Sequence, residues 1–149
     1  MKLGFVSAIL DGWTFEEMID TASEMGFSCV EVACWPSGKA ERRYAGVSPI
    51  NVDSLSDEKA AYILNYCKER KVEISSLAYY PNTLDGNLEK RVCVVEHLKN
   101  VIRASHKLGV NMVTTFIGRD QTKSVEQNLA LVKEVWPPII ALAEELGAK

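Results

Sequence analysis

The sequence predicts four consecutive strand-then-helix units of a parallel α/β protein, the first half of a (β/α)8 barrel in one domain, residues 1–149. Three observations predict this fold class. A short segment that closes a helix and opens a strand recurs, capping signals precede amphipathic segments, and runs rich in β-branched residues lie between them. The last copy of the recurring segment stops where a fifth strand is expected to begin.

The recurring segment reads EMGFSCVEV, ERKVEISSL, KLGVNMVTT and, cut short, ELGAK. The aligned positions are Gly26, Lys71, Gly109 and Gly147. Helices commonly end at a residue in the left-handed conformation, which glycine adopts without steric cost. We therefore expect a helix to end at each position, with Lys71 as the imperfect copy.

The expected strands are residues 3–9, 29–35, 73–80 and 112–117, each rich in β-branched or aromatic residues. Because helices separate them, the strands are expected to run parallel with right-handed connections. In the second strand, alternation separates an apolar face toward the helices from a face inside the barrel. The first face would hold Val30, Val32 and Cys34, and the second Glu31, Ala33 and Trp35.

The first expected helix begins at Thr14, which forms a capping box with Glu17. The next two helices are predicted from apolar stripes at helical spacing. These stripes are Ala60, Ile63, Leu64 and Cys67 in the second helix, and Val92, Val95, Leu98 and Ile102 in the third.

The fourth helix is expected to begin at Ser124, which forms a second capping box with Gln127. Pro137 and Pro138 follow within the same amphipathic segment. Because proline lacks the amide hydrogen that a helix interior needs, we expect this helix to consist of two pieces.

The connection between the second strand and the second helix, residues 36–56, is long, since about 2 to 6 residues are usual. It leaves the carboxyl end of its strand, where parallel α/β proteins bind ligands, and carries Arg42, Arg43 and Tyr44. Two interpretations stay open: a lid over a substrate, and a solvated insertion without function.

Composition excludes several classes of partner. The chain has 17 basic and 20 acidic residues, a net charge of -3 and no polybasic run, so neither nucleic acid nor a membrane surface is an expected partner.

The four cysteines show no CxxC pair or zinc spacing and are expected to be small apolar residues in a reducing compartment. No signal peptide is recognisable, so a cytoplasmic location is expected.

The chain resembles, in five consecutive stretches, the first four β/α units of the sugar phosphate isomerase/epimerase family of xylose isomerase-like TIM barrels. The stretches are GFSCVEVACWP, RRYAGV, EISSLAYYPN, GVNMVTTFIGRD and VEQNLALVKEVWPPIIALAEELG. The resemblance implies two glutamates that move a proton next to a sugar carbonyl, and a divalent metal (Mn, Mg, Co or Zn) that polarises the carbonyl oxygen. It also implies that the metal ligands lie on strands five to eight. This chain alone is therefore expected to bind no catalytic metal and to be inactive.

The substrate-facing rim of the first half is what the resemblance carries over. It implies that Trp35, Tyr80, Asn82, Phe116 and Arg119 contact a sugar or sugar phosphate. Strand alternation adds Glu31 to these candidates, and the long connection adds Arg43.

Each candidate also has a purely structural interpretation. Glu31 is alternatively a polar residue of the barrel interior that neighbouring strands satisfy, and Trp35 and Tyr80 are alternatively packing residues. Asn82 suits a turn, and Arg119 is alternatively the partner of Asp120 in a surface ion pair.

The two histidines, His97 and His106, are expected on one helix. At about 100° per residue their spacing places them on opposite faces, so we do not expect them to share a metal.

Two functions stay open, with a third that the motifs disfavour. The first is the N-terminal half of a metal-dependent sugar isomerase or epimerase. The alternative is a stand-alone half-barrel that assembles with itself or with a separate C-terminal half, because four strands leave two sheet edges and an inner face open. An open flavodoxin-like nucleotide-binding or receiver module lacks the expected GxGxxG and P-loop motifs.

Overall fold

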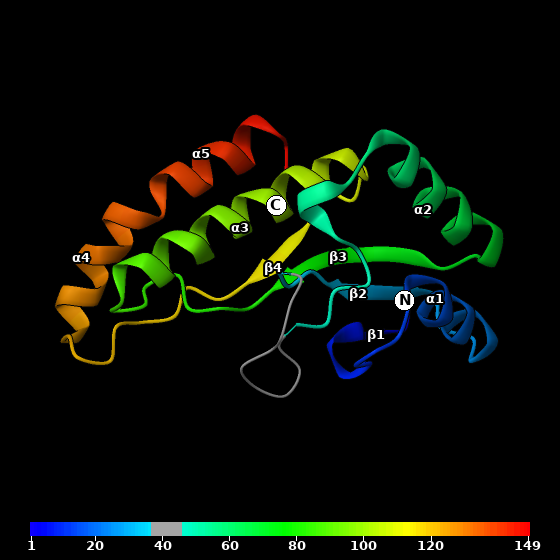
Figure 1. Cartoon of the computed structure of the whole chain (residues 1–149), viewed down its shortest axis with the longest axis horizontal. Coiled ribbons are helices and arrows are strands. Elements are labelled where there is room, and N and C mark those ends of the chain that lie inside the picture. Colours follow the sequence, from blue (N-terminus) through cyan, green and yellow to red (C-terminus); the bar gives the residue numbers. More distant parts are fainter. Residues whose placement is uncertain (37–45) are drawn as a thin grey trace.

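The computed structural model describes residues 1–36 and 46–149, which form a four-stranded parallel sheet in the order β1-β2-β3-β4. The strands are β1 (Gly4–Val6), β2 (Cys29–Ala33), β3 (Glu73–Tyr79) and β4 (Val113–Thr115). The helices are α1 (Phe15–Glu24), α2 (Asp57–Arg70), α3 (Leu88–Lys107), α4 (Val125–Val135) and α5 (Pro137–Glu145). Figure 1 shows the helices in an arc along one side of the sheet. The predicted order of strand-then-helix units is confirmed.

The strands are shorter than the sequence predicts. After β1 the chain turns into a short 3-10 helix, η1 (Ser7–Ile9). The hydroxyl of Ser7 accepts the amide hydrogen of Ala33 at 2.8 Å, so a side chain replaces a carbonyl of the β ladder at the end of β2. This hydrogen bond explains why the pairing of β1 with β2 stops there.

The predicted helix ends are confirmed. Thr14 and Ser124 each form the expected capping box at the start of α1 and α4. Lys71 has a left-handed φ of 56°, as the glycines at the equivalent positions do. The fourth helix is divided at Trp136, directly before Pro137.

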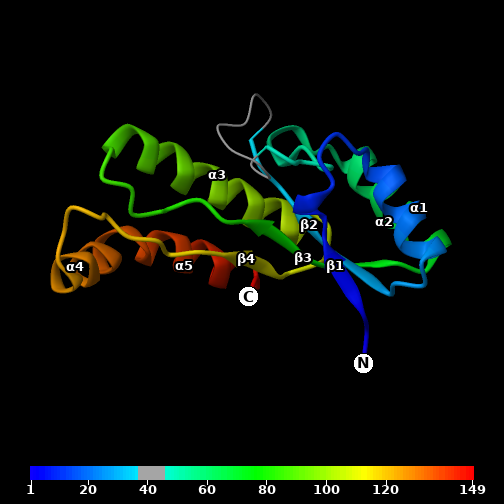
Figure 2. The same cartoon turned by 90° about the horizontal axis from the view of Figure 1, so that it is seen from below.

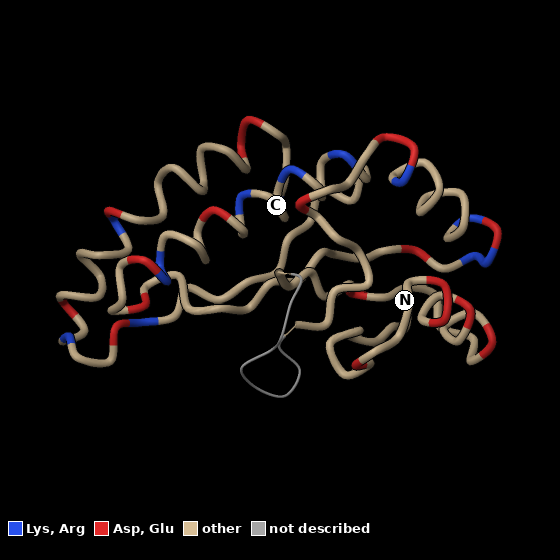
Figure 3. Tube along the Cα trace, in the orientation of Figure 1, with Lys and Arg blue, Asp and Glu red and all other residues tan. Residues whose placement is uncertain are grey.

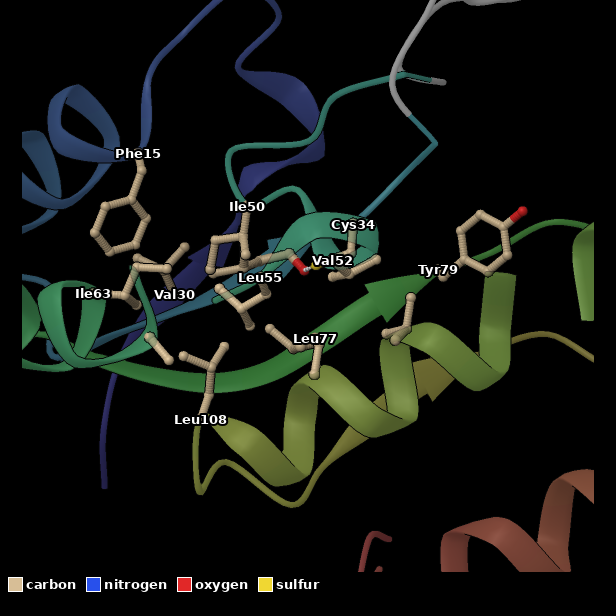
Figure 4. Close-up of a cluster of buried hydrophobic side chains, with 14 of the residues drawn as sticks. Phe15, Val30, Cys34, Ile50, Val52, Leu55, Ile63, Leu77, Tyr79 and Leu108 are labelled. Atoms are coloured by element: carbon tan, nitrogen blue, oxygen red, sulfur yellow. Dashed lines mark hydrogen bonds between the residues drawn. The ribbon is translucent and has the colours of Figure 1, made fainter. Parts of the chain in front are cut away.

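The hydrophobic core lies between the sheet and the helices, with Leu77 of β3 fully buried in it (Figure 4). The second part of the long connection belongs to this core, since Ile50, Val52 and Leu55 are buried there, the last two in and beside the 3-10 helix η2 (Val52–Ser54). Residues 46–56 are therefore a packed segment and not a solvated insertion. The first part of the connection, with Arg42, Arg43 and Tyr44, lies outside the described residues.

The backbone at Lys149 already pairs with the outer edge of β4 (Figure 2). The Lys149 amide donates to the Asn111 carbonyl at 2.9 Å, and the Val113 amide donates to the Lys149 carbonyl at 2.9 Å. These two hydrogen bonds have the pattern of a parallel ladder. Lys149 thus lies where a fifth parallel strand runs in a barrel.

Acidic and basic residues are interspersed along the trace of the helices and their ends (Figure 3). In the same part of the chain, each helix is too short or too polar to cross a membrane.

Candidate functional site

The face of the sheet that points away from the helices carries a polar layer. Strand register pairs Glu31 with Ser76 and Ala78 with Thr114, so the side chains of Glu31, Ser76 and Thr114 share this face. The Glu31 carboxylate accepts hydrogen bonds from Ser76 Oγ at 2.9 Å, from Thr114 Oγ1 at 3.0 Å and from the Tyr80 hydroxyl. We call these four residues the Glu31 layer.

The Glu31 layer joins three neighbouring strands through one carboxylate. Three hydroxyl groups surround Glu31, so its carboxylate oxygens are hydrogen-bonded without a basic partner among the described residues. This geometry agrees with the interpretation of Glu31 as a polar residue of the barrel interior.

Tyr80 follows β3 and marks the rim of this face. Its ring contacts that of Phe116, with 4.7 Å between the ring centroids, and Phe116 is 59% exposed beyond β4. Burial, and then the hydrogen bond to Glu31, raise the pKa of Tyr80, so the phenol keeps its proton at neutral pH. The rim therefore combines a protonated phenol with an exposed aromatic surface.

Trp35 does not point into the barrel beside Glu31 as strand alternation predicts. Because β2 ends at Ala33, the alternation does not continue to Trp35. Its ring lies 5.4 Å from that of Tyr79, which in turn lies 4.6 Å from the ring of His97 on α3. Trp35 thus packs on the helix side of the sheet, as its structural alternative expects.

The two histidines make separate structural contacts. His97 is buried and its Nε2 donates to the Cys34 carbonyl at 2.9 Å, while His106 Nδ1 donates to the Leu146 carbonyl at 2.9 Å. His97 Nδ1 lies 3.4 Å from the carboxylate of Asp53. The two rings thus contact different parts of the chain, as their spacing on the helix predicts.

Asn82 connects the loops that follow β3 and β4. Its Oδ1 accepts the amide hydrogen of Leu84 at 3.0 Å, which is the predicted turn chemistry. Its Nδ2 donates to the Arg119 carbonyl at 2.8 Å. Asn82 therefore holds the backbone of Arg119, whose exposed side chain remains at the rim.

A second pair of hydrogen bonds joins the loops that follow β3 and β4 to each other and to Trp136. The Thr83 hydroxyl donates to the Ile117 carbonyl at 2.7 Å, and Trp136 Nε1 donates to the Thr83 hydroxyl at 3.0 Å. Together, Asn82, Thr83 and Trp136 fix the rim to the start of α5. We call these three residues the loop clamp.

Asp120 is buried beneath the rim, with 3% of its surface exposed. Its carboxylate pairs with Lys123 at 2.6 Å and accepts the hydroxyl and amide hydrogens of Thr122 at 2.7 and 3.0 Å. The structural alternative for Arg119, an ion pair with Asp120, is not found among the described residues, where Asp120 pairs with Lys123. The hydrogen bonds from Lys123 and Thr122 hold the pKa of Asp120 well below its usual range.

This lowered pKa predicts a loss of stability in acid. A carboxyl group with a lowered folded pKa stabilises the fold above its ordinary pKa, and that contribution is lost as the pH falls toward the folded value. Asp120→Asn is expected to lower the midpoint of urea denaturation at neutral pH. The difference in midpoint between this variant and wild type is expected to become smaller as the pH falls below the ordinary pKa of a carboxyl group. Asp11→Asn is the control, because Asp11 is exposed and makes no side-chain hydrogen bond among the described residues. A gap independent of pH would contradict the role of the Asp120 charge.

Sequence reasoning missed Ser76, Thr114 and Thr83. Alternation alone places Ser76 and Tyr80 on one face of their strand. The register that brings them to Glu31 depends on an irregularity between Val30 and Glu31 in the pairing of β2 with β3. The sequence gives no signal for that irregularity.

The described residues do not form a metal site. In residues 1–36 and 46–149, no three His, Cys, Asp or Glu side chains lie together so that they could hold a metal ion. The Glu31 carboxylate is already bonded to three hydroxyl groups. The donor set of this part of the chain therefore does not fit the divalent metal that the resemblance implies.

The fold is half of a parallel barrel. The Glu31 layer lies on its inner face, and the rim lies at the carboxyl ends of β3 and β4. Residues 19–149 match the xylose isomerase-like TIM barrel family, and the chain belongs to this family. No curated protein sequence matches it significantly.

Solved structures of this fold are similar to the whole chain. They include D-psicose 3-epimerase with D-tagatose from Clostridium cellulolyticum H10 (TM-score 0.71, 16% identity, 99% of this chain and 50% of that chain). The IOLI protein with a bound zinc atom has a TM-score of 0.68 at 16% identity, over 100% of this chain and 50% of that one. The probable 3-DHS dehydratase AsbF from Bacillus anthracis has a TM-score of 0.71 at 16% identity, over 99% of this chain and 50% of that chain. The chain thus spans about half the length of these proteins.

Proposed function

We propose that this chain provides the N-terminal half of a metal-dependent sugar or sugar phosphate isomerase or epimerase, which moves a proton next to the substrate carbonyl. The observation that carries the proposal is the rim, where the Glu31 layer and Phe116 place hydroxyl and aromatic groups at the carboxyl ends of β3 and β4. Ligands of barrel enzymes bind at this end of the strands. Membership of the xylose isomerase-like family supports the same substrate class.

The chemistry is divided between this chain and the residues that complete the barrel. Because the described residues lack a metal donor set, the divalent metal (Mn, Mg, Co or Zn) and the proton-transferring glutamates are assigned to the other half. The backbone hydrogen bonds of Lys149 to Asn111 and Val113 show that the edge of β4 accepts parallel pairing. This chain alone is then inactive.

The rim residues bind and orient the sugar in this proposal. Tyr80 and Phe116 contact its carbon skeleton and hydroxyl groups, and Asn82 and Arg119 lie where a hydroxyl or phosphate group is bound. The proposed contact of Arg43 involves a residue outside the described part of the chain. The remaining candidate, Trp35, acts through packing behind Tyr79.

A fusion tests the proposal. The chain is joined after Lys149 to the C-terminal half of the Clostridium cellulolyticum D-psicose 3-epimerase, a fold relative. Solvent deuterium is expected to enter D-fructose or D-psicose at the carbon next to the carbonyl when Mn²⁺, Co²⁺, Mg²⁺ or Zn²⁺ is present, and NMR measures it. The chain alone and the C-terminal half alone are expected to show no exchange.

Two results would contradict the proposal. A fusion that circular dichroism shows to be folded, yet gives no exchange with any metal, would argue against a sugar substrate at this rim. Exchange by the unfused chain at the rate of the fusion would place the reactive groups in residues 1–149.

Self-assembly is the second candidate function. The sheet ends in the edges β1 and β4, and Leu3, Val6, Phe116 and Ile117 are exposed on or beside these strands. Exposed apolar residues next to open edges favour pairing with another chain. Light scattering on the purified chain is expected to give a dimer if this function holds, and a stable monomer would rule it out.

A further inference from the structure

The protons of the Glu31 layer can be assigned from its donors and acceptors. An ionised carboxylate accepts hydrogen bonds and has none to donate. Ser76 Oγ and Thr114 Oγ1 lie 2.9 and 3.0 Å from Glu31 Oε2, and the Tyr80 hydroxyl is the partner of Oε1. Each hydroxyl carries one proton. The other acceptor near Thr114 Oγ1, the Leu77 carbonyl, is more distant at 3.5 Å, so we assign all three protons to Glu31.

This assignment leaves the Tyr80 oxygen as an acceptor toward the open face of the sheet. Thr114 Oγ1 lies 3.2 Å from the Tyr80 oxygen, but its proton is directed to Glu31. Tyr80 is half-buried beside the exposed ring of Phe116, so a ligand on this face can reach it. In the described part of the chain, no lysine or arginine forms an ion pair with Glu31, so its negative charge acts on any such ligand.

We infer that Tyr80 accepts a hydrogen bond from a hydroxyl group of an uncharged sugar, and that Glu31 is the positioning residue that fixes the direction of the Tyr80 proton. The inference rests on the proposed sugar substrate and narrows it. A sugar hydroxyl supplies the proton that this position lacks. A phosphate supplies acceptor oxygens and negative charge. At this position its oxygens would be repelled by the lone pair of the Tyr80 oxygen and by the negative charge of the Glu31 carboxylate. The Tyr80 position therefore selects a sugar hydroxyl over a phosphate group, and Arg119 remains the rim residue proposed to bind a phosphate.

Binding to the purified chain tests this selectivity without turnover. The probes are D-fructose and D-fructose 1,6-bisphosphate, titrated by ligand-detected NMR. Both probes are titrated against Arg119→Ala, which removes the rim cation that the proposed function assigns to a phosphate. This variant is expected to bind the bisphosphate at least about tenfold more weakly than D-fructose, the effect of one unmatched polar contact. Tyr80→Phe is expected to weaken D-fructose binding by about tenfold, because the acceptor is removed.

Glu31→Gln separates positioning from a merely structural role. Glutamine brings amide hydrogens of its own and releases the Tyr80 proton, so the preference for D-fructose over the bisphosphate is expected to shrink. The matched control is Tyr62→Phe, because the Tyr62 hydroxyl donates to Glu16 Oε1 at 2.8 Å on the exposed surface of the helices. This control is expected to leave both dissociation constants unchanged.

The Tyr80 hydroxyl proton gives a readout that does not depend on a ligand. In wild type it is expected as a downfield proton NMR signal that is absent from Tyr80→Phe and moves in Glu31→Gln. If Glu31→Gln does not fold, the wild-type signal and the Tyr80→Phe titration decide the question.

Three results would overturn the inference: equal or tighter binding of the bisphosphate by Arg119→Ala, unchanged D-fructose binding by Tyr80→Phe, or no detectable binding of D-fructose by wild type. The proposed function fails separately. Selective binding without deuterium exchange by the fusion would leave the inference standing, and exchange with unselective binding would leave the proposed function standing.

Discussion

Gly118→Ala is expected to destabilise the chain by about 2 to 4 kcal/mol and to loosen the rim, because the new methyl group has no room. A Cβ atom at Gly118 would lie 2.0 Å from Oδ1 and 3.0 Å from Cα of Asn82. The φ of Gly118 is +76°, which a residue with a side chain rarely adopts. Asn82 must therefore move, and its hydrogen bond to the Arg119 carbonyl is lost with it. Urea denaturation measures the change in the free energy of unfolding.

Gly12→Ala is the matched control for this effect. Gly12 has a φ of +80°, but a Cβ atom there would have no neighbour within 4 Å. Its substitution is expected to cost only the backbone strain, about 1 kcal/mol. Equal losses of unfolding free energy in the two variants would show that the contact with Asn82 does not contribute to the cost of Gly118→Ala.

A double-mutant cycle then assigns the difference to Asn82. Asn82→Ala removes the side chain that the new methyl group meets, so Gly118→Ala is expected to cost less in that background than in wild type. Additive losses would contradict the role of Asn82 in the loop clamp.

The elements that sequence patterns predicted correctly are those determined by neighbouring residues. The capping boxes of Thr14 and Ser124, the helix break before Pro137 and the left-handed Lys71 each depend on a few consecutive positions. Such interactions lie within the chain segment itself, so sequence is enough to find them.

The candidate site was predicted less completely because it depends on contacts between distant segments. Glu31 and Tyr80 were both candidates, but their hydrogen bond joins residues 49 positions apart and requires the register of two strands. The Lys123 partner of Asp120 and the packing of Trp35 against Tyr79 likewise follow from where loops fold back. The sequence is enough to propose candidate residues for the rim, but the partner of each residue depends on how distant segments fold together.

The apolar stripes show the same limit for helices. The sequence predicts Val92 on the buried stripe of α3, but Val92 is 53% exposed, because it borders a groove toward α4 and not the sheet. On the same helix, Val94 and Val101 are buried instead. A helix with two contact surfaces has two apolar stripes, and the sequence does not rank them.

Leu77→Ala is expected to lower the free energy of unfolding by about 2 to 5 kcal/mol, since it opens a cavity in the middle of the core. Leu77 is 0% exposed on β3 and lies between residues of β2, α3 and the packed segment 46–56 (Figure 4). The control is Leu64→Ala on α2, a position that the sequence predicts to be buried but that is 43% exposed. It is expected to cost less than about 1 kcal/mol, because most of the lost surface was already in water. Equal losses in urea denaturation would mean that the stripe predicted from the sequence, and not the observed face of α2, packs on the core.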